Sequence, residues 1–98
     1  MVKNIVWPEI VQKQLQQAYN YIRQNSPQNA EKVKKDILNS TRELLSNPEK
    51  HPPDKYRINN DGTFRAYELH RFRISYKISK GEIIIVRVRH TKMKPQLY

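Results

Sequence analysis

The sequence has no cysteine, only two glycines and only nine acidic residues among its 98. Without cysteine the chain can form neither a disulfide nor a thiolate metal site, which suits a reducing cytosol. Two glycines are too few for a glycine-rich phosphate loop, and the three histidines are scattered, with no carboxylate cluster beside them. We therefore expect neither a metal nor a cofactor.

Long hydrophobic runs are also missing. No segment approaches the roughly 20 apolar residues that span a bilayer. The first eight residues lack the continuous apolar stretch of a signal peptide. The length suits one domain, since domains run from roughly 50 to 250 residues. We expect a single soluble domain over residues 1–98, located in the cytoplasm and without a membrane partner.

Basic residues dominate the composition. Nineteen lysines and arginines against nine acidic residues give a net charge of +10, and the isoelectric point is near 10. Such an excess favours an anionic partner, which could be a nucleic acid, an acidic protein or a membrane surface. No segment has the amphipathic pattern with a lysine- and arginine-lined face that the last of these requires. The mean hydropathy of −0.92 would also fit a disordered chain, but the regular periodicity argues against that.

The first half of the chain is predicted to be mainly helical. Residues 3–7 have the pattern of a short strand, which Pro8 ends. Apolar residues then recur at spacings of three and four over residues 9–25, as on one face of an amphipathic helix. The serine and proline at 26–27 predict the start of a second helix, because serine is a preferred N-cap and proline suits the first helical position. Residues 9–47 should form an antiparallel helical hairpin.

The second half is predicted to be a loop followed by strands. Residues 48–63 hold three prolines and an Asn-Asn-Asp-Gly run, which is typical of a loop, with room for a short strand at 55–58. Aromatic and β-branched residues then alternate with polar ones, which predicts an antiparallel meander over residues 64–90 and a basic tail over 91–98. The expected fold is α+β, with an N-terminal strand and the helical hairpin packed on one face of a mostly antiparallel four-stranded sheet.

Strand alternation predicts which side chains face the helices. In the second meander strand, the apolar side chains on one face are Phe72, Ile74, Tyr76 and Ile78. In the third strand, the face opposite Arg87 and Arg89 is predicted to hold Ile84, Val86, Val88 and His90. The free face of the sheet should then carry the side chains of Arg73, Arg87 and Arg89, with Arg65 as a further candidate.

Arginines gathered on one sheet face suit phosphate binding, because planar guanidinium groups match phosphate oxygens in pairs. The alternative interpretation is that outward-facing charges protect a sheet from aggregation. For a single arginine the protective role is the better interpretation. For the whole set, together with the net charge of +10, we favour a surface that binds RNA.

Histidines and tyrosines supply further candidates. His90 should end the last strand, where its imidazole could either transfer a proton near neutral pH or close the core as a half-buried side chain. His51 and His70 are interpreted as solvated loop residues. Tyr98 could stack on an unpaired base, although terminal residues are often frayed. Glu68 is expected to pair with an arginine across the sheet rather than act as a base.

Several motifs occur in an order that covers nearly the whole chain. They are Ile5-Val6-Trp7-Pro8, the helix break at Asn25-Ser26-Pro27, Leu45-Ser46-Asn47-Pro48, Phe72-Arg73-Ile74-Ser75-Tyr76 and Ile85-Val86-Arg87-Val88-Arg89-His90. This pattern resembles the RelE/ParE superfamily of bacterial toxins from type II toxin-antitoxin systems. The superfamily includes ribosome-dependent mRNA endonucleases and DNA gyrase inhibitors, so the fold alone does not choose between them.

The resemblance implies an endonuclease as the first hypothesis. Arg73 matches the arginine that faces the scissile phosphate in RelE-like enzymes, His90 matches a catalytic histidine of some relatives, and Tyr98 resembles a functional tyrosine in their basic tail. The implied mechanism is metal-independent attack of an mRNA 2′-hydroxyl on its 3′-phosphate in the ribosomal decoding site. Arg65 or Arg89 would help Arg73 to stabilise charge. Some relatives carry lysines that have no clear equivalents in this sequence, Arg65 being the nearest. The identity of the general base therefore stays open.

Further RNA contacts are expected from the remaining basic residues of the loop, last strand and tail. These are Lys55, Arg57, Arg87, Arg89, Lys92 and Lys94. Two alternatives remain, a gyrase inhibitor without nuclease activity and a basic module that only binds RNA or protein. Under either toxin hypothesis we expect a cognate antitoxin whose acidic or amphipathic segment covers the helical hairpin and the basic face.

Overall fold

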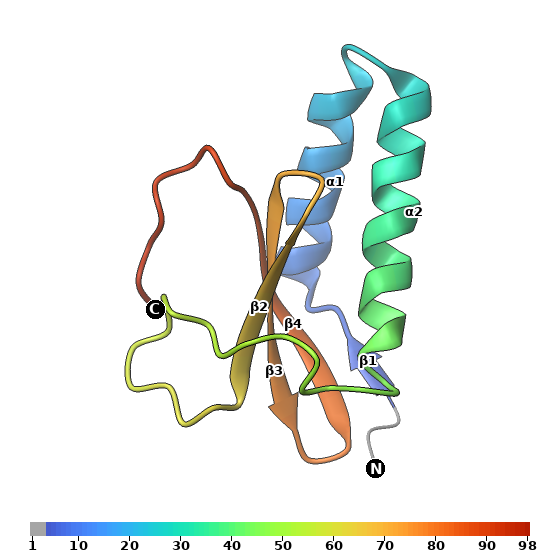
Figure 1. Cartoon of the computed structure of the whole chain (residues 1–98). Coiled ribbons are helices and arrows are strands. Elements are labelled where there is room, and N and C mark those ends of the chain that lie inside the picture. Colours follow the sequence, from blue (N-terminus) through green and yellow to red (C-terminus); the bar gives the residue numbers. More distant parts are fainter. Residues whose placement is uncertain (1–3) are drawn as a thin grey trace.

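The computed structural model describes residues 4–98, and it places a hairpin of two helices against one face of a four-stranded sheet (Figure 1). The elements are β1 (Asn4–Val6), α1 (Glu9–Arg23), α2 (Pro27–Glu43), β2 (Phe64–Leu69), β3 (Phe72–Ser79) and β4 (Glu82–His90). The strand order is β1-β4-β3-β2, in which β1 runs parallel to β4 and the other pairs are antiparallel. The predicted fold class is confirmed. The predicted first strand included Lys3, which lies outside the described residues.

The helix boundaries follow from local hydrogen bonds. Ser26 is the N-cap of α2, and its hydroxyl accepts a hydrogen bond from the amide of Asn29 at 3.2 Å. α1 ends at Arg23, two residues before the predicted end. α2 ends at Glu43, and residues 44–46 form tight turns in which each amide donates to the carbonyl three residues earlier. The predicted hairpin is therefore confirmed but stops about one turn earlier.

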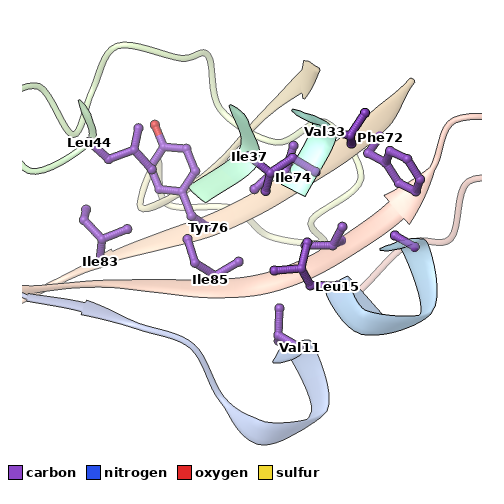
Figure 2. Close-up of a cluster of buried hydrophobic side chains, with 12 residues drawn as sticks. Val11, Leu15, Val33, Ile37, Leu44, Phe72, Ile74, Tyr76, Ile83 and Ile85 are labelled. Atoms are coloured by element: carbon purple, nitrogen blue, oxygen red, sulfur yellow. The ribbon is translucent and has the colours of Figure 1, made fainter. Parts of the chain in front are cut away.

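The hydrophobic core lies between the helical hairpin and the sheet. Figure 2 shows side chains from both helices meeting those of β3 and β4, namely Val11, Leu15, Val33, Ile37, Phe72, Ile74, Tyr76, Ile83 and Ile85. The ring of Tyr76 is fully buried, and its hydroxyl donates a hydrogen bond to the carbonyl of Pro48 at 2.7 Å. The predicted apolar face of β3 is thus confirmed, and Tyr76 also fixes the start of the loop after α2.

A β-bulge in β4 corrects the predicted faces of that strand. Ser75 pairs with Arg87 and Tyr76 pairs with Ile85, so Val86 is an extra residue with no partner across the pair. Such a residue reverses the alternation of the strand. Ile83 and Ile85 are therefore buried against the helices, and the prediction of Ile84 and Val86 at those places is wrong. Beyond the bulge the prediction holds, because Val88 is buried on the helix side.

The loop before β2 runs along the outer edge of that strand. An isolated bridge joins Pro53 to Arg65, and the amide of Asp54 donates to the carbonyl of Phe64 at 2.8 Å. The short strand that was possible at 55–58 does not form, since these residues form turns and a bend. The side chain of Asn60 holds the turns by donating to the carbonyls of Asp54 and Phe64. Within residues 4–98, neither helix has the length and apolar character needed to cross a membrane.

Candidate functional site

The sheet face turned away from the helices carries three arginines, here called the arginine face: Arg73, Arg87 and Arg89. Strand register explains this grouping, because Arg73 pairs with Arg89 across β3 and β4 while Ser75 pairs with Arg87 in the neighbouring row. Paired residues of adjacent strands project from the same face of a sheet. The predicted placement of these three arginines is therefore confirmed.

A buried carboxylate lies at the centre of this face. The loop brings Asp54 to within 2.9 Å of an Arg73 Nη atom, measured from its Oδ1 atom, and only 2% of the residue is exposed. The same oxygen accepts the amide of Tyr56 at 3.0 Å, and Oδ2 accepts the hydroxyl of Tyr98 at 2.5 Å. Burial alone would raise the pKa of Asp54, but the hydrogen bonds from Tyr98 and Arg73 outweigh it and hold the pKa below its usual value.

Arg73 is largely occupied by contacts within the protein. Besides Asp54, its guanidinium contacts the carboxylate of Glu68 at 3.5 Å, which confirms the expected role of Glu68 as a cross-strand partner. The guanidinium also lies over the ring of Tyr56, 4.8 Å from the ring centroid. Only 18% of the Arg73 side chain is exposed. Arg73 is therefore a partly buried and charge-paired side chain, and a phosphate would have to compete with two carboxylates for it.

The C-terminal tail, residues 91–98, folds back across the arginine face toward the loop (Figure 1). The amide of Tyr98 donates to the carbonyl of Tyr56 at 2.9 Å, and the ring of Tyr98 lies 4.1 Å from the Arg87 guanidinium. Gln96 accepts hydrogen bonds from both remaining arginines, with its carbonyl 3.1 Å from Arg87 and its side-chain oxygen 3.2 Å from Arg89. The tail is thus fixed by a set of polar contacts rather than frayed.

Burial and the Asp54 contact change the acidity of the tail tyrosine. Burial in the first place, and then the hydrogen bond to Asp54, raise the pKa of Tyr98 to about 12. Burial also lowers the pKa of Arg87, and the nearby Arg89 acts in the same direction. At neutral pH Tyr98 is therefore a protonated hydrogen-bond donor. It could accept a proton only after these contacts were broken.

His90 lies on the opposite face of the sheet from Arg73. It pairs with Phe72 on the helix side, and the two ring centroids are 5.0 Å apart in an edge-to-face arrangement. Its Nδ1 atom accepts the amide of Lys92 at 3.0 Å, which leaves the proton of a neutral imidazole on Nε2. The structure therefore favours the interpretation of His90 as a half-buried side chain that closes the core. It does not bring His90 together with Arg73.

Arg65 is also placed differently from the prediction. It pairs with Tyr76 and so projects from the helix side of the sheet rather than from the arginine face. Its Nε and Nη1 atoms donate to the carbonyls of Gly62 at 3.1 Å and His51 at 2.7 Å. The prediction that Arg65 lies beside Arg73 is therefore wrong. Its observed contacts hold both ends of the loop together.

The other two histidines, His51 and His70, both contact side chains of the protein. The ring of His51 stacks on that of Tyr67 at 4.1 Å, and burial lowers the pKa of His51. An imidazole nitrogen of His70 lies 2.7 Å from the carboxylate of Asp36 in α2, joining the β2–β3 turn to the helical hairpin. His51 is therefore half-buried rather than solvated, whereas His70 is an exposed turn residue, as expected, that also contacts Asp36.

The remaining predicted RNA contacts are divided between the loop and the tail. Arg57 stacks on the ring of Phe64 at 3.9 Å, and the Lys55 ammonium lies 5.3 Å from the centroid of the Tyr56 ring. Both tail lysines, at 92 and 94, are exposed. None of these four cations pairs with a carboxylate among the described residues. Their charges are therefore not neutralised by ion pairs, in contrast to the charge of Arg73.

Sequence reasoning missed Asp54 and Gln96, the two residues that hold the site together. Asp54 is one of three acidic residues in the loop at 48–63, and each of them could have been considered as a partner for an arginine of the sheet. Gln96 carries no comparable signal, because its contacts depend on how the tail folds. Among the described residues, no three acidic or histidine side chains converge so as to hold a metal ion.

The helical hairpin, the β1-β4-β3-β2 sheet and the arginine face define a toxin of the RelE/ParE superfamily. Residues 5–95 match the family model described as "ParE toxin of type II toxin-antitoxin system, parDE". The chain therefore belongs to the ParE toxin family. A solved structure titled "Chromosomal ParDE TA system from P. aeruginosa" has the same fold, with a TM-score of 0.74 and 19% identity, over 94% of this chain and 98% of that chain. No curated protein matches the sequence.

Proposed function

We propose that this toxin arrests growth by binding DNA gyrase in the cytoplasm, and that it does not cleave RNA. Membership of the ParE family makes it the toxin of a type II toxin-antitoxin system with a cognate antitoxin. The observation that carries the proposal is the pairing of Arg73 with Asp54 and Glu68 beneath the folded tail. Arg73 would be the main cation of a nuclease, and its charge is already neutralised by these two carboxylates.

An endonuclease of the expected kind needs preorganised positive charge aimed at the phosphate as negative charge develops on it. Here the nearest groups to the Arg73 guanidinium are carboxylates, which would repel that charge. Neither proposed proton carrier is in place, because Tyr98 donates to Asp54 and His90 lies on the other sheet face. The carboxylates of Asp54 and Glu68 and the side chains of Tyr98 and His90 would all have to move before cleavage. Inhibition by binding is therefore the simpler function for this arrangement.

The ribosome-dependent endonuclease remains the second candidate, and one observation favours it. The Nε atoms of Arg73 and Arg87 are buried without a hydrogen-bond partner among the described residues. Both side chains, with Arg89, line a cavity of about 50 Å³ under the tail. A phosphate oxygen would satisfy unpaired donors of this kind, since guanidinium groups bind phosphate well. Such binding would require the tail to open.

Two assays, one with the purified protein and one in cells that express it, separate these functions. In the first, DNA gyrase supercoils a relaxed plasmid with increasing toxin present, and we expect supercoiling to fall as toxin is added. In the second, transcript ends are mapped after brief induction in cells, and we expect no new ends. Unimpaired supercoiling together with new transcript ends would refute the proposal in favour of the endonuclease. If neither effect occurs, the protein is a basic binding module, and the gyrase proposal is equally refuted.

A further inference from the structure

Two arginines of β4, here called the arginine pair, carry positive charge that no described carboxylate neutralises. Arg87 and Arg89 are two residues apart in the strand, so their side chains project from the same sheet face. Neither forms an ion pair within residues 4–98, whereas Arg73 contacts both Asp54 and Glu68. Arg87 is half-buried, and burial lowers its pKa, with Arg89 acting in the same direction. Two like charges are therefore held side by side without an anion between them.

Gln96 of the tail occupies the place where an anion would bind. Its main-chain carbonyl accepts a hydrogen bond from Arg87 at 3.1 Å, and its side-chain Oε1 atom accepts one from Arg89 at 3.2 Å. One neutral residue thus presents two oxygens to two neighbouring guanidinium groups. A phosphate oxygen in either place would add Coulomb attraction to the hydrogen bond, and guanidinium groups can bind phosphate with two donors at once.

The tail also covers a donor that has no acceptor. The ring of Tyr98 lies over the Arg87 guanidinium at 4.1 Å. The Nε atom of Arg87 is buried, and none of the described residues accepts a hydrogen bond from it. A buried donor without an acceptor is unfavourable. Movement of the ring away from Arg87 would expose Nε, so that it could join a two-donor contact with an anion. Gln96 is itself exposed, and residues 94–98 have no regular secondary structure that would have to unfold.

The surroundings of the arginine pair favour a short anion. Both arginines line the cavity of about 50 Å³ under the tail, which exceeds the roughly 10–15 Å³ that a single water requires. Across the sheet, Arg89 lies opposite Arg73, which in turn lies opposite Glu68. The carboxylates of Asp54 and Glu68 on that side would repel the further phosphates of a long chain. Two guanidinium groups without carboxylate partners match two adjacent phosphate groups.

We propose that the arginine pair binds a diphosphate group and that the tail is its internal competitor. Oxygens of the two phosphates would replace the carbonyl and the Oε1 atom of Gln96, and the ring of Tyr98 would move off Arg87. Ligand binding and tail closure exclude each other, so each weakens the other by the same factor. Inorganic diphosphate and the diphosphate group of a nucleotide supply the same chemistry. The proposal does not depend on the choice between gyrase inhibition and RNA cleavage.

The first test is titration calorimetry of the full-length protein at constant ionic strength, with inorganic diphosphate in one arm and ADP in the other. Arg89→Gln removes one member of the pair. Arg42→Gln removes the same charge at an exposed residue of α2 that forms no ion pair among the described residues. We expect Arg89→Gln to weaken binding about tenfold or more, because it removes hydrogen bonds between charged groups. Arg42→Gln should bind within about twofold of wild type.

The two arms identify the source of the ligand. Similar affinities for inorganic diphosphate and ADP would show that the diphosphate group alone is recognised, and tighter binding of ADP would assign the site to a nucleotide. Either result supports the proposal. Equal losses in Arg89→Gln and Arg42→Gln, or no binding of either compound by the wild-type protein, would overturn it.

The second test asks whether the tail competes with the ligand. Gln96→Ala removes a neutral acceptor from Arg89 without changing any charge, so it should tighten diphosphate binding about two- to tenfold, the equivalent of one hydrogen bond. Gln28→Ala makes the same change at an exposed residue of α2 and should leave the affinity unchanged. A basic surface that attracts anions without competition would show equal affinities in these two variants, and that result would overturn the proposal.

Amide hydrogen exchange reports the position of the tail directly. The amide of Tyr98 donates to the carbonyl of Tyr56, so its exchange should become faster when diphosphate saturates the protein. The amide of Asp54, which donates to Phe64 within the loop, should exchange at an unchanged rate. Unchanged exchange at Tyr98 in the saturated protein would refute release of the tail. Because neither gyrase nor RNA is present in these tests, their failure is distinguishable from failure of the proposed function.

Discussion

Asp54 is expected to contribute more to stability than any other acidic residue described here, and Asp54→Ala tests this. The substitution removes the buried partner of Arg73 and the acceptor of the Tyr98 hydroxyl. Breaking a buried ion pair by removing one partner typically costs about 3–5 kcal/mol. The cost should be lower here, because Arg73 keeps its contact with Glu68 and 18% of its side chain is exposed. We expect a loss of about 2–3 kcal/mol, below the fully buried case.

The measurement is urea denaturation followed by far-ultraviolet circular dichroism at pH 7. Glu49→Ala provides the matched control, because it removes one negative charge from the same loop at an exposed residue that forms no described ion pair. Its effect should stay within about 0.5 kcal/mol, as for most surface substitutions. If Asp54→Ala were no more destabilising than Glu49→Ala, the pairing of Asp54 with Arg73 would not be a stabilising feature of the site.

The stability difference between wild type and Asp54→Ala should also depend on pH. The folded pKa of Asp54 lies below its ordinary value of 3.8, so near pH 4 the unfolded chain binds more protons than the folded one. The stabilisation is therefore fully present above that ordinary value and is lost as the pH falls through the folded pKa. The difference in unfolding free energy between wild type and Asp54→Ala should be constant from pH 8 to 5 and shrink below pH 4. A difference that closed between pH 6 and 8 would assign the effect to another group.

Three further predictions use the same denaturation assay. Ser26→Ala should cost about 1 kcal/mol, because it removes the N-cap hydrogen bond of α2. Ile85→Ala should cost about 2–4 kcal/mol and Ile84→Ala clearly less, since only Ile85 is fully buried; the reverse order would refute the bulge. Tyr98→Phe should cost about 1–2 kcal/mol by removing a hydrogen bond to a charged acceptor, and an unchanged stability would place the tail elsewhere.

Most of the fold was predictable because local signals agreed with each other. The apolar spacing of α1 and the Ser-Pro pair at 26–27 both mark helix boundaries, and the structure follows them to within about one turn. The face of Arg73 was equally predictable, since β3 alternates strictly between apolar and polar side chains. Where one period runs without interruption, alternation decides which face is buried.

β4 shows where alternation fails. Residues 83–86 are all Ile or Val, so nothing in the sequence distinguishes the buried face from the other or reveals an extra residue at Val86. Only pairing with β3 determines the bulge. Arg65 was misplaced for a related reason, because its face depends on its pairing with Tyr76 and not on its own charge. The sheet face on which a charged side chain lies is therefore determined by strand register rather than by its charge.

The candidate site was less predictable than the fold, because its centre is made by segments distant in sequence. Asp54, Arg73 and Tyr98 come from the loop, β3 and the tail, and no spacing rule connects them. The basic composition was correctly interpreted as excess positive charge, but not as charge that the protein itself partly neutralises. Counting arginines on a face therefore overestimates its capacity for phosphate unless buried carboxylates are counted with them.

The contacts around Arg73 also determine which movement could change the function. The tail is held mainly by polar contacts of Gln96 and Tyr98, each typically worth about 1 kcal/mol or somewhat more when one group is charged. A multivalent anion could displace it and gain access to Arg87 and Arg89. Asp54 would remain, because the loop holds it through its own backbone bonds. Release of the tail alone would thus produce an anion-binding surface, whereas a nuclease would also require separation of Asp54 from Arg73.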